Sequence, residues 1–359
     1  METKYEMVKQ DLKEKILSGF YTFNDKLPTE STMMKTYQVS RYTIRRAISD
    51  LEAEHYIFTI QGGGMFVDDW QKQQEPQVFE QKQIGVITTH IADYIFPNII
   101  TGIDRYVSGE GYSVLISNTQ NDPEKERSSI KKMLDNNLSG LIIEPTQSAL
   151  GDPNKDLFEQ IKASGLPTIF INSHYADLDF PYIEMNDVAA GKVVTDALFN
   201  LGHEQILGIF KIDDGQGVHR MNGYVKSYQE HSKFSYLSEI VMYQTSDNMH
   251  SVFTKIERIL RREDHPTAIV CYNDQLAIKI IDLIRSLNMQ VPEDISVIAF
   301  DNYQLSQYLS PKLSTVEHPK EKMGRDAAKM LFDIMNGNEQ PKSIRYDPQL
   351  ILRESTFNK

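Results

Sequence analysis

The chain has 359 residues, with 38 basic and 50 acidic side chains and a formal net charge of -12. At about 150 residues per domain, this length predicts two or three domains rather than one. The single Cys271 excludes an internal disulfide framework. The first residues contain neither a charged-then-apolar signal segment nor a membrane-spanning stretch, so we expect a soluble, cytoplasmic protein.

Helices are expected along most of the first 53 residues. Apolar side chains recur at helical spacing over residues 5–17 and predict a first helix. Thr29 can cap a short second helix that ends near Tyr37, and Ser40 can cap a third that ends near Ala53. The turn before Ser40 would then join two helices in the manner of a helix-turn-helix.

The third helix has a basic edge opposite its apolar face. Ile44 and Ile48 recur at helical spacing, while Arg41 and Arg45 lie one turn apart on the edge of the other face. A guanidinium group binds guanine through two hydrogen bonds and also binds phosphate. The arginine pair therefore fits a DNA-reading face better than an ordinary solvated face, and we expect this helix to enter a major groove.

A glycine-rich hairpin is expected after the third helix. Residues 57–60 and 65–67 alternate between apolar and polar around the glycines and predict two strands. Gly63 at the tip would let the backbone approach a phosphate closely, although the same residues also fit an ordinary hairpin turn. No Gly-Lys-Ser/Thr follows, so a nucleotide-binding loop is not indicated. Helices and hairpin together predict a small α+β winged helix-turn-helix domain over residues 1–70.

This part of the sequence resembles the GntR-type winged helix. The shared motifs are Leu27-Pro-Thr-Glu, Val39-Ser-Arg-Tyr-Thr-Ile-Arg-Arg-Ala and Gln61-Gly-Gly-Gly-Met-Phe-Val. The resemblance implies that Arg41 and Arg45 read bases and that Lys4 and Gln61 assist at the backbone or wing. One departure is His55, which stands where such domains usually turn on glycine. It does not remove an expected DNA contact.

The remainder predicts a polar linker followed by an α/β body. Residues 71–83, QKQQEPQVFEQKQ, contain almost no core-forming side chains, so we expect them to join two folded parts. From residue 84 to 359, β-rich runs alternate with helical segments such as residues 187–201 and 274–287, which predicts parallel sheets covered by helices on both faces. We expect two sheets with a cleft between them. The predicted strands are residues 84–89, 112–117, 140–145, 167–172, 206–210, 268–273 and 296–300.

Polar and aromatic side chains follow several of these strands, at the ends where doubly wound sheets bind ligands. Carboxylates and amides form hydrogen bonds with vicinal hydroxyls, and aromatic rings stack on the apolar face of a sugar. A single Asp or Asn at a helix start is more often a cap. The convergence of several such side chains at strand ends favours a sugar site instead. The candidates are Tyr94, Phe96, Glu144, Asp187, Arg220, Asn273, Asp274 and Asp301.

Residues 83–359 also resemble the LacI/GalR-type effector domain, which is similar to periplasmic sugar-binding proteins. The shared segments include Asn186-Asp187 with Gly191, Arg220-Met-Asn-Gly-Tyr and Val291-Pro-Glu-Asp-Ile-Ser-Val-Ile-Ala-Phe-Asp. The resemblance implies that Arg220, Asn273 or Asp274, and Asp301 bind the effector. The hinge helix of ordinary LacI-type regulators has no counterpart here.

A GntR-type head on a LacI-type body resembles the L-arabinose-responsive repressors of bacilli. The resemblance implies a homodimer that binds double-stranded operator DNA and leaves it when L-arabinose binds. It implies no cofactor and no membrane partner. The direction of the response, induction rather than co-repression, comes from the resemblance alone.

Other functions fit parts of the sequence. An enzyme could use Glu144 and Asp274 as an acid and base pair acting on a sugar, but the sequence has no Gly-x-Ser-x-Gly or His-Glu-x-x-His motif. The nine histidines show no ligand spacing, so no metal is expected. A regulator of the same architecture could also bind another small polar ligand. A secreted binding protein is disfavoured by the DNA-binding motifs.

Overall fold

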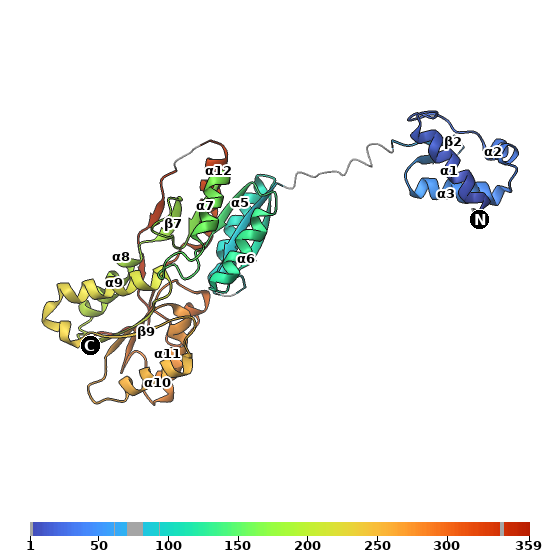
Figure 1. Cartoon of the computed structure of the whole chain (residues 1–359). Coiled ribbons are helices and arrows are strands. Elements are labelled where there is room, and N and C mark those ends of the chain that lie inside the picture. Colours follow the sequence, from blue (N-terminus) through green and yellow to red (C-terminus); the bar gives the residue numbers. More distant parts are fainter. Residues whose placement is uncertain (1–2, 61, 70–81, 93, 338–340) are drawn as a thin grey trace. The chain divides into compact units, whose positions relative to one another are not determined.

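The computed structural model describes residues 3–60, 62–69, 82–92, 94–337 and 341–359. The chain divides into two compact units, Met1–Glu80 and Gln81–Lys359, which we call the head and the body (Figure 1). Gln61 and residues 71–81 of the predicted linker lie outside the described residues. Within the described ranges, no helix combines the length and the apolar composition that crossing a bilayer requires.

The head has the helices and the hairpin that the sequence predicts. Its elements are α1 (Lys4–Leu17), α2 (Glu30–Tyr37), α3 (Arg41–Ala53), β1 (Ile57–Ile60) and β2 (Gly64–Val67). The side chains of Thr29 and Ser40 cap α2 and α3 by accepting backbone hydrogen bonds. β1 and β2 pair antiparallel. His55 has a φ of 57°, so the backbone adopts the left-handed turn at the position where the resemblance implies a glycine.

The first lobe of the body contains a parallel six-stranded sheet in the order β13-β7-β6-β5-β3-β4. Helices cover both faces. Val86 packs in a cluster with α5 and α12, whereas its neighbour Ile87 packs in a cluster with α6 and α7. The elements are β3 (Gln83–Thr88), α5 (Phe96–Gly109), β4 (Ser113–Asn118), α6 (Pro123–Leu134), β5 (Gly140–Ile143), α7 (Lys155–Ser164), β6 (Thr168–Ile171), β7 (Tyr182–Met185), α12 (Lys320–Met335) and β13 (Ile344–Tyr346).

The second lobe contains a parallel four-stranded sheet in the order β11-β10-β8-β9. Residues of α8 and α9 pack in one core cluster and residues of α10 and α11 in another, so this sheet is also covered on both faces. The elements are α8 (Asp187–Asn200), β8 (Ile206–Lys211), α9 (Gly215–Glu230), β9 (Glu239–Tyr243), α10 (Met249–Leu260), β10 (Ala268–Cys271), α11 (Asp274–Ser286) and β11 (Ser296–Ile298).

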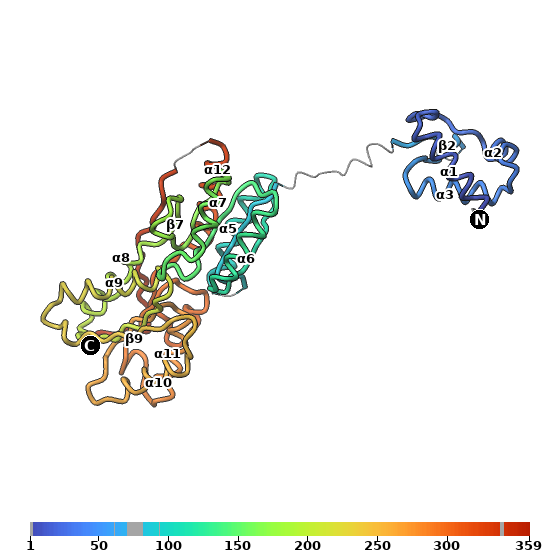
Figure 2. Tube along the Cα trace, in the orientation of Figure 1, coloured from blue at the N-terminus to red at the C-terminus, as the bar shows by residue number. Residues whose placement is uncertain are grey.

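The chain passes between the lobes more than once, as the trace in Figure 2 shows. It enters the second lobe between β7 and α8 and returns before α12. After β13 it crosses again, and β14 (Leu350–Ile351) pairs antiparallel with β12 (Thr315–Val316). These crossings place the carboxyl ends of strands from both sheets around one cleft.

All seven predicted body strands are present, and five further strands were not predicted: β7, β9, β12, β13 and β14. β9 and β13 are edge strands, and each has an exposed central or near-central side chain, Met242 and Arg345. An edge strand needs no continuous apolar run, so its sequence signal is weak. β3 begins at Gln83, which the prediction had counted as the last residue of the linker.

Candidate functional site

A cavity of about 250 Å³ lies between the two lobes of the body. Its walls include Thr89 and Asn172, which directly follow β3 and β6 of the first sheet. From the second sheet come Lys211 at the end of β8 and Asn273 after β10. The carboxyl ends of both sheets therefore face one small cavity, as expected for a ligand site in doubly wound sheets.

Arg220 of α9 is the centre of a buried charged cluster in this cavity. Its Nε donates to Asp187 Oδ1 at 2.8 Å, and its Nη2 donates to Asp301 Oδ1 at 2.8 Å. Nη1 donates to the carbonyl oxygen of Tyr272 at 2.7 Å, and the guanidinium lies 4.6 Å from the ring centre of Phe300. These bonds use three of the five N–H donors of the guanidinium group.

The pKa values of the two carboxyl groups that share Arg220 shift in opposite directions. Burial raises the pKa of Asp187 to about 7, although Arg220 opposes that shift. At Asp301, burial is outweighed by Arg220, and the pKa stays below its usual range. Tyr94 also donates its hydroxyl to Asp301 Oδ2 at 2.8 Å. Near neutral pH, the cluster can therefore both donate and accept hydrogen bonds.

Glu144 organises the wall formed by the first lobe. Its Oε2 accepts hydrogen bonds from both hydroxyls of Thr88 and Thr89 and from the Thr89 N–H, at 2.8 to 2.9 Å. Its Oε1 accepts from Asn172 Nδ2 at 3.0 Å. The carboxylate lines the cavity but is already held by four donors.

Two buried polar atoms of the cavity wall have no hydrogen-bond partner among the described residues: Asn172 Oδ1 and His318 Nδ1. Burial lowers the pKa of His318 to about 3, so its imidazole is neutral at physiological pH. A buried polar atom without a partner costs roughly 1–3 kcal/mol. These two atoms therefore favour a ligand that brings hydrogen-bonding groups of its own.

Seven of the eight candidate ligand-site residues line the cavity: Tyr94, Phe96, Glu144, Asp187, Arg220, Asn273 and Asp301. Asn273 also caps α11 by accepting a bond from the Leu276 N–H at 2.9 Å. Cap and cavity roles are thus combined in one residue.

Asp274 is the exception, because its side chain is not part of the cavity wall. Oδ2 accepts from the Tyr303 N–H at 2.7 Å and from Ser306 Oγ at 2.5 Å, and Oδ1 accepts from Thr315 Oγ1 at 2.7 Å. Burial raises the pKa of this carboxyl to about 7. Through these bonds, Asp274 holds the segment after β11 in place. Because its carboxyl group is not in the cavity wall, Asp274 cannot act there with Glu144 as an acid and base pair.

Several residues of the cavity wall were not predicted from the sequence. Asn172 and Lys211 stand at the ends of predicted strands, so the strand-end argument could have included them. Burial tends to lower the pKa of Lys211, but Asp214 and Asp213 outweigh it and raise the pKa, and Nζ lies 3.1 Å from Asp214 Oδ2. His318 follows β12 at a crossing between the lobes, and no local sequence signal marks it.

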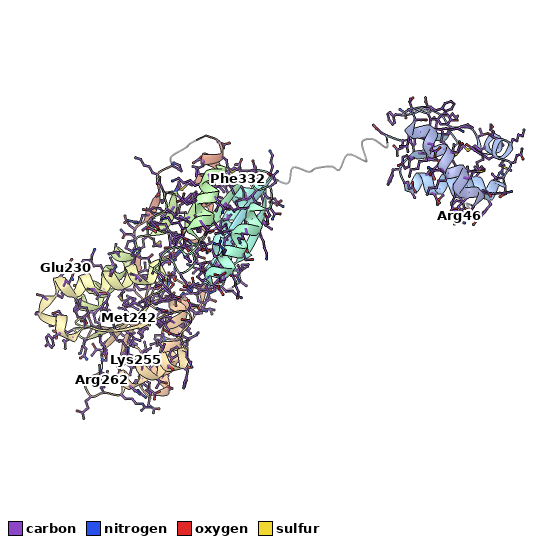
Figure 3. The ribbon with its side chains drawn as sticks, viewed as in Figure 1. Arg46, Glu230, Met242, Lys255, Arg262 and Phe332 are labelled. Atoms are coloured by element: carbon purple, nitrogen blue, oxygen red, sulfur yellow. The ribbon has the colours of Figure 1, made fainter. Side chains whose placement is uncertain are left out.

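The head presents its own candidate interface along α3. The side chains of Arg41 and Arg45 are 61% and 65% exposed, and both contact Glu30 at the start of α2. Arg45 Nε lies 2.9 Å from Glu30 Oε1, and Arg41 Nε lies 3.5 Å from Oε2. Glu30 thus holds the two guanidinium groups side by side. Arg46, labelled in Figure 3, lies instead over the ring of Tyr5, 4.0 Å from its centre.

The other predicted DNA contacts lie on α1 and the wing. Lys4 is exposed at the start of α1. In the hairpin, Gly62 and Gly64 have φ values of 76° and 116°, and Gly63 between them has no side chain to obstruct a phosphate. A Cβ on Gly63 would lie 2.8 Å from Ile60 Cγ2, so the turn itself also favours glycine here. Gln61 is outside the described residues.

Comparisons with known proteins identify both parts. Residues 4–67 match the bacterial regulatory proteins of the gntR family, and residues 195–356 match the periplasmic binding protein-like domain. A solved LacI family transcriptional regulator from Enterococcus faecium with bound ribose has a TM-score of 0.67 and 21% identity. It covers 77% of this chain and 100% of its own, and this likeness shows the fold of the body.

Two relatives match the chain nearly end to end. The arabinose metabolism transcriptional repressor of Halalkalibacterium halodurans is 39% identical over 364 residues, which cover 99% of this chain and 97% of that repressor. The repressor of the same name from Geobacillus stearothermophilus is 38% identical and covers 98% of this chain and 97% of its own length. The chain, with its gntR-type head and periplasmic-binding-like body, therefore belongs to the family of the arabinose metabolism transcriptional repressors.

Proposed function

We propose that the protein represses sugar-utilisation genes by binding operator DNA through its head, and that L-arabinose in the body cavity releases it. The observation that carries the effector site is the buried Arg220 cluster, which lines the same cavity as Asn172 and His318 with their unpaired polar atoms. A pentose is neutral and carries hydroxyls that both donate and accept hydrogen bonds, so it can satisfy both walls. The printed names of the relatives supply the identity of the sugar.

DNA binding is assigned to α3 and the wing. Arg41 and Arg45 would read bases in a major groove. Lys4, on α1, and Gln61 and Gly63, in the wing, would assist by contacting the DNA backbone. Glu30 must share or release the guanidinium groups when they meet DNA. The target DNA is inside the cell, so the proposal places the protein in the cytoplasm. A homodimer would read a palindromic operator with one head per half-site.

Release requires that the sugar bind two arrangements of the body with different affinity. If the sugar binds more tightly to closed lobes and the operator binds more tightly to the other arrangement, each ligand weakens the binding of the other. A coupling of about 1–3 kcal/mol would change operator affinity by roughly 5 to 150 fold. No catalytic step is needed, which agrees with relatives that are named as transcriptional repressors.

The test is a calorimetric titration of the whole protein with L-arabinose, its C2 epimer L-ribose and its C4 epimer D-xylose. We expect L-arabinose to bind at least about tenfold more tightly than either epimer, because a misplaced hydroxyl leaves fixed polar groups unpaired. A gel shift with a duplex selected in vitro should then show release by L-arabinose alone.

Three outcomes contradict parts of the proposal. If no pentose binds, the effector assignment is wrong. If a different small polar molecule binds and releases the duplex, the architecture is right and the sugar is wrong. If nuclear magnetic resonance shows that the added sugar is converted, the protein is an enzyme and the sensor assignment fails.

A further inference from the structure

Two loops of the first lobe bind the second lobe directly beside the cavity. In the loop between β4 and α6, Asn121 Nδ2 donates to Asp213 Oδ2 at 3.2 Å and to Thr245 Oγ1 at 2.7 Å. In the loop after β5, Ser148 Oγ accepts a hydrogen bond from the Gly215 N–H at 2.9 Å. Asn121 and Thr245 line the cavity, whereas Ser148 and Gly215 do not. The second contact thus lies outside the sugar site.

The two loops are tied to each other within the first lobe. Gln147 donates its backbone N–H to Asn121 Oδ1 at 2.8 Å and its side-chain Nε2 to the Asn121 carbonyl at 3.1 Å. One layer deeper, Thr146 Oγ1 donates to Thr119 Oγ1 at 2.9 Å. The loops therefore form one unit. We call the whole arrangement the clasp: Asn121, Gln147 and Ser148 of the first lobe with Asp213, Gly215 and Thr245 of the second.

Backbone conformation sets the clasp apart from ordinary surface loops. Gln120, Asn121 and Gln147 have φ values of 53°, 55° and 47°, in the left-handed region that side chains rarely adopt. Such residues persist only where the surrounding structure holds them, and they gather at ligand clamps and switch regions. Asn121 is also buried, although it sits in a loop.

The Ser148 contact also completes the start of α9. The first N–H groups of a helix have no partner within the helix. Asp214 Oδ1 accepts the Gly217 N–H at 2.8 Å, and Ser148 supplies an acceptor for Gly215 from the opposite lobe. α9 carries Arg220, so separating the lobes would uncover the start of the helix that positions the charged cluster.

We propose that the clasp holds the lobes closed over the ligand and thereby sets the sugar concentration at which the repressor leaves DNA. This inference rests on the proposed function. The bonds of Asn121 to Asp213 and Thr245, and of Ser148 to Gly215, exist only when the lobes meet, so they stabilise the closed state selectively. The apparent affinity for a ligand scales with the population of the state that binds it. Ser148 is therefore a positioning residue that raises sugar affinity without contacting the sugar.

The first test compares Ser148→Ala with Ser286→Ala, in which the lost hydroxyl donates only to the Leu283 carbonyl of its own helix. Ser148→Ala should weaken binding of L-arabinose and of its weaker epimers by one common factor, roughly 2 to 10 fold, with faster dissociation. Operator affinity without sugar should not change. Ser286→Ala should match the wild type in every measurement.

A sugar-contacting residue would behave differently, because its loss would change the affinity ratio between epimers. If Ser148→Ala changes that ratio, or leaves all affinities and dissociation rates at wild-type values, the clasp does not set the threshold. Thermal melts of both variants would show whether a loss of affinity reflects unfolding instead.

The second test locks the clasp with a disulfide between Ser148→Cys and Gly215→Cys. A Cβ at Gly215 would lie 3.3 Å from Ser148 Oγ, which is close to the spacing a disulfide needs. That Cβ would also lie 2.7 Å from Ser173 Oγ, so Ser173→Ala is included. The native Cys271 is buried and should not compete. Protein oxidised in the presence of L-arabinose should lose the sugar at least about tenfold more slowly than the reduced form.

The outcomes separate the clasp from the proposed function. A wild type that binds no L-arabinose refutes the effector assignment, and the yield of cross-link still shows whether the lobes meet at these residues. A folded cysteine pair that does not cross-link refutes the clasp, even if the wild type binds the sugar. The single Ser148→Cys variant controls for oxidation elsewhere.

Discussion

Arg220 determines the charge balance of the cavity. It is buried between Asp187 and Asp301, and each of its three hydrogen bonds ends on a different element or loop. Burying a carboxylate without a partner is costly, so the position requires a cation. It also requires the planar fork of arginine, because an ammonium group cannot reach three acceptors in fixed directions.

Arg220→Lys should therefore keep the charge of the cluster but lose its geometry. We expect L-arabinose affinity to fall by roughly 10 to 100 fold, because hydrogen bonds to charged groups contribute about 1.5–3 kcal/mol. The head is unchanged, so the variant should bind operator and resist release at sugar concentrations that release the wild type. Calorimetry and the gel shift measure the two effects separately.

The matched control is Arg262→Lys in the same lobe. Figure 3 shows Arg262 at the edge of that lobe, where its guanidinium pairs with Glu239 at 2.5 Å and is 40% exposed. An exposed ion pair contributes little, so this variant should bind sugar like the wild type. If Arg220→Lys is also indistinguishable from the wild type, Arg220 serves the fold and not the ligand.

At the scale of residues, the sequence predicted the strand-end positions but not which way each side chain would turn. Asn273 and Asp274 are neighbours, yet Asn273 lines the cavity while Asp274 binds Tyr303, Ser306 and Thr315 behind it. Those partners lie about 30 residues or more further along the chain, beyond any local pattern. His318 was missed because a crossing between the lobes brings it to the cavity.

At the scale of elements, local sequence features are sufficient to predict α3. Ser40 caps it, and Ile44, Ala47, Ile48 and Leu51 form its buried face. The same signals leave Arg41 and Arg45 on the exposed side. Edge strands such as β13 lack comparable signals, because their pairing depends on a sheet assembled from distant segments.

Arg45→Ala should weaken specific operator binding by about 1–3 kcal/mol, because one bidentate base contact is lost. Binding to scrambled DNA should change less, and L-arabinose affinity should not change. The exposed pair of Arg45 with Glu30 contributes little to stability, so the thermal melt of the head should stay near wild type. Gel-shift affinities for operator and scrambled duplexes that both remain at wild-type values would exclude a base-reading role.

At the scale of the whole molecule, the head and the body have separate hydrophobic cores. The head cluster draws on Val8, Leu12, Ile44 and Leu51, among others, and includes none of the described residues of the body. The body clusters draw only on residues of the second unit. Separate cores favour independent folding of the two parts, which is also what the polar composition of residues 71–83 predicts.

A specific protease site inserted within residues 71–81 should separate the two activities without unfolding either part. After cleavage, we expect the body to bind L-arabinose with wild-type affinity, since its cavity draws only on body residues. Operator affinity should fall by about 10² to 10⁴ fold, because heads no longer joined through the proposed dimer of bodies lose their high effective concentration. The remaining DNA binding should not respond to the sugar. A body that precipitates after cleavage would show that the parts stabilise each other, and cleaved heads with full operator affinity would argue against a dimer that presents two heads to one operator.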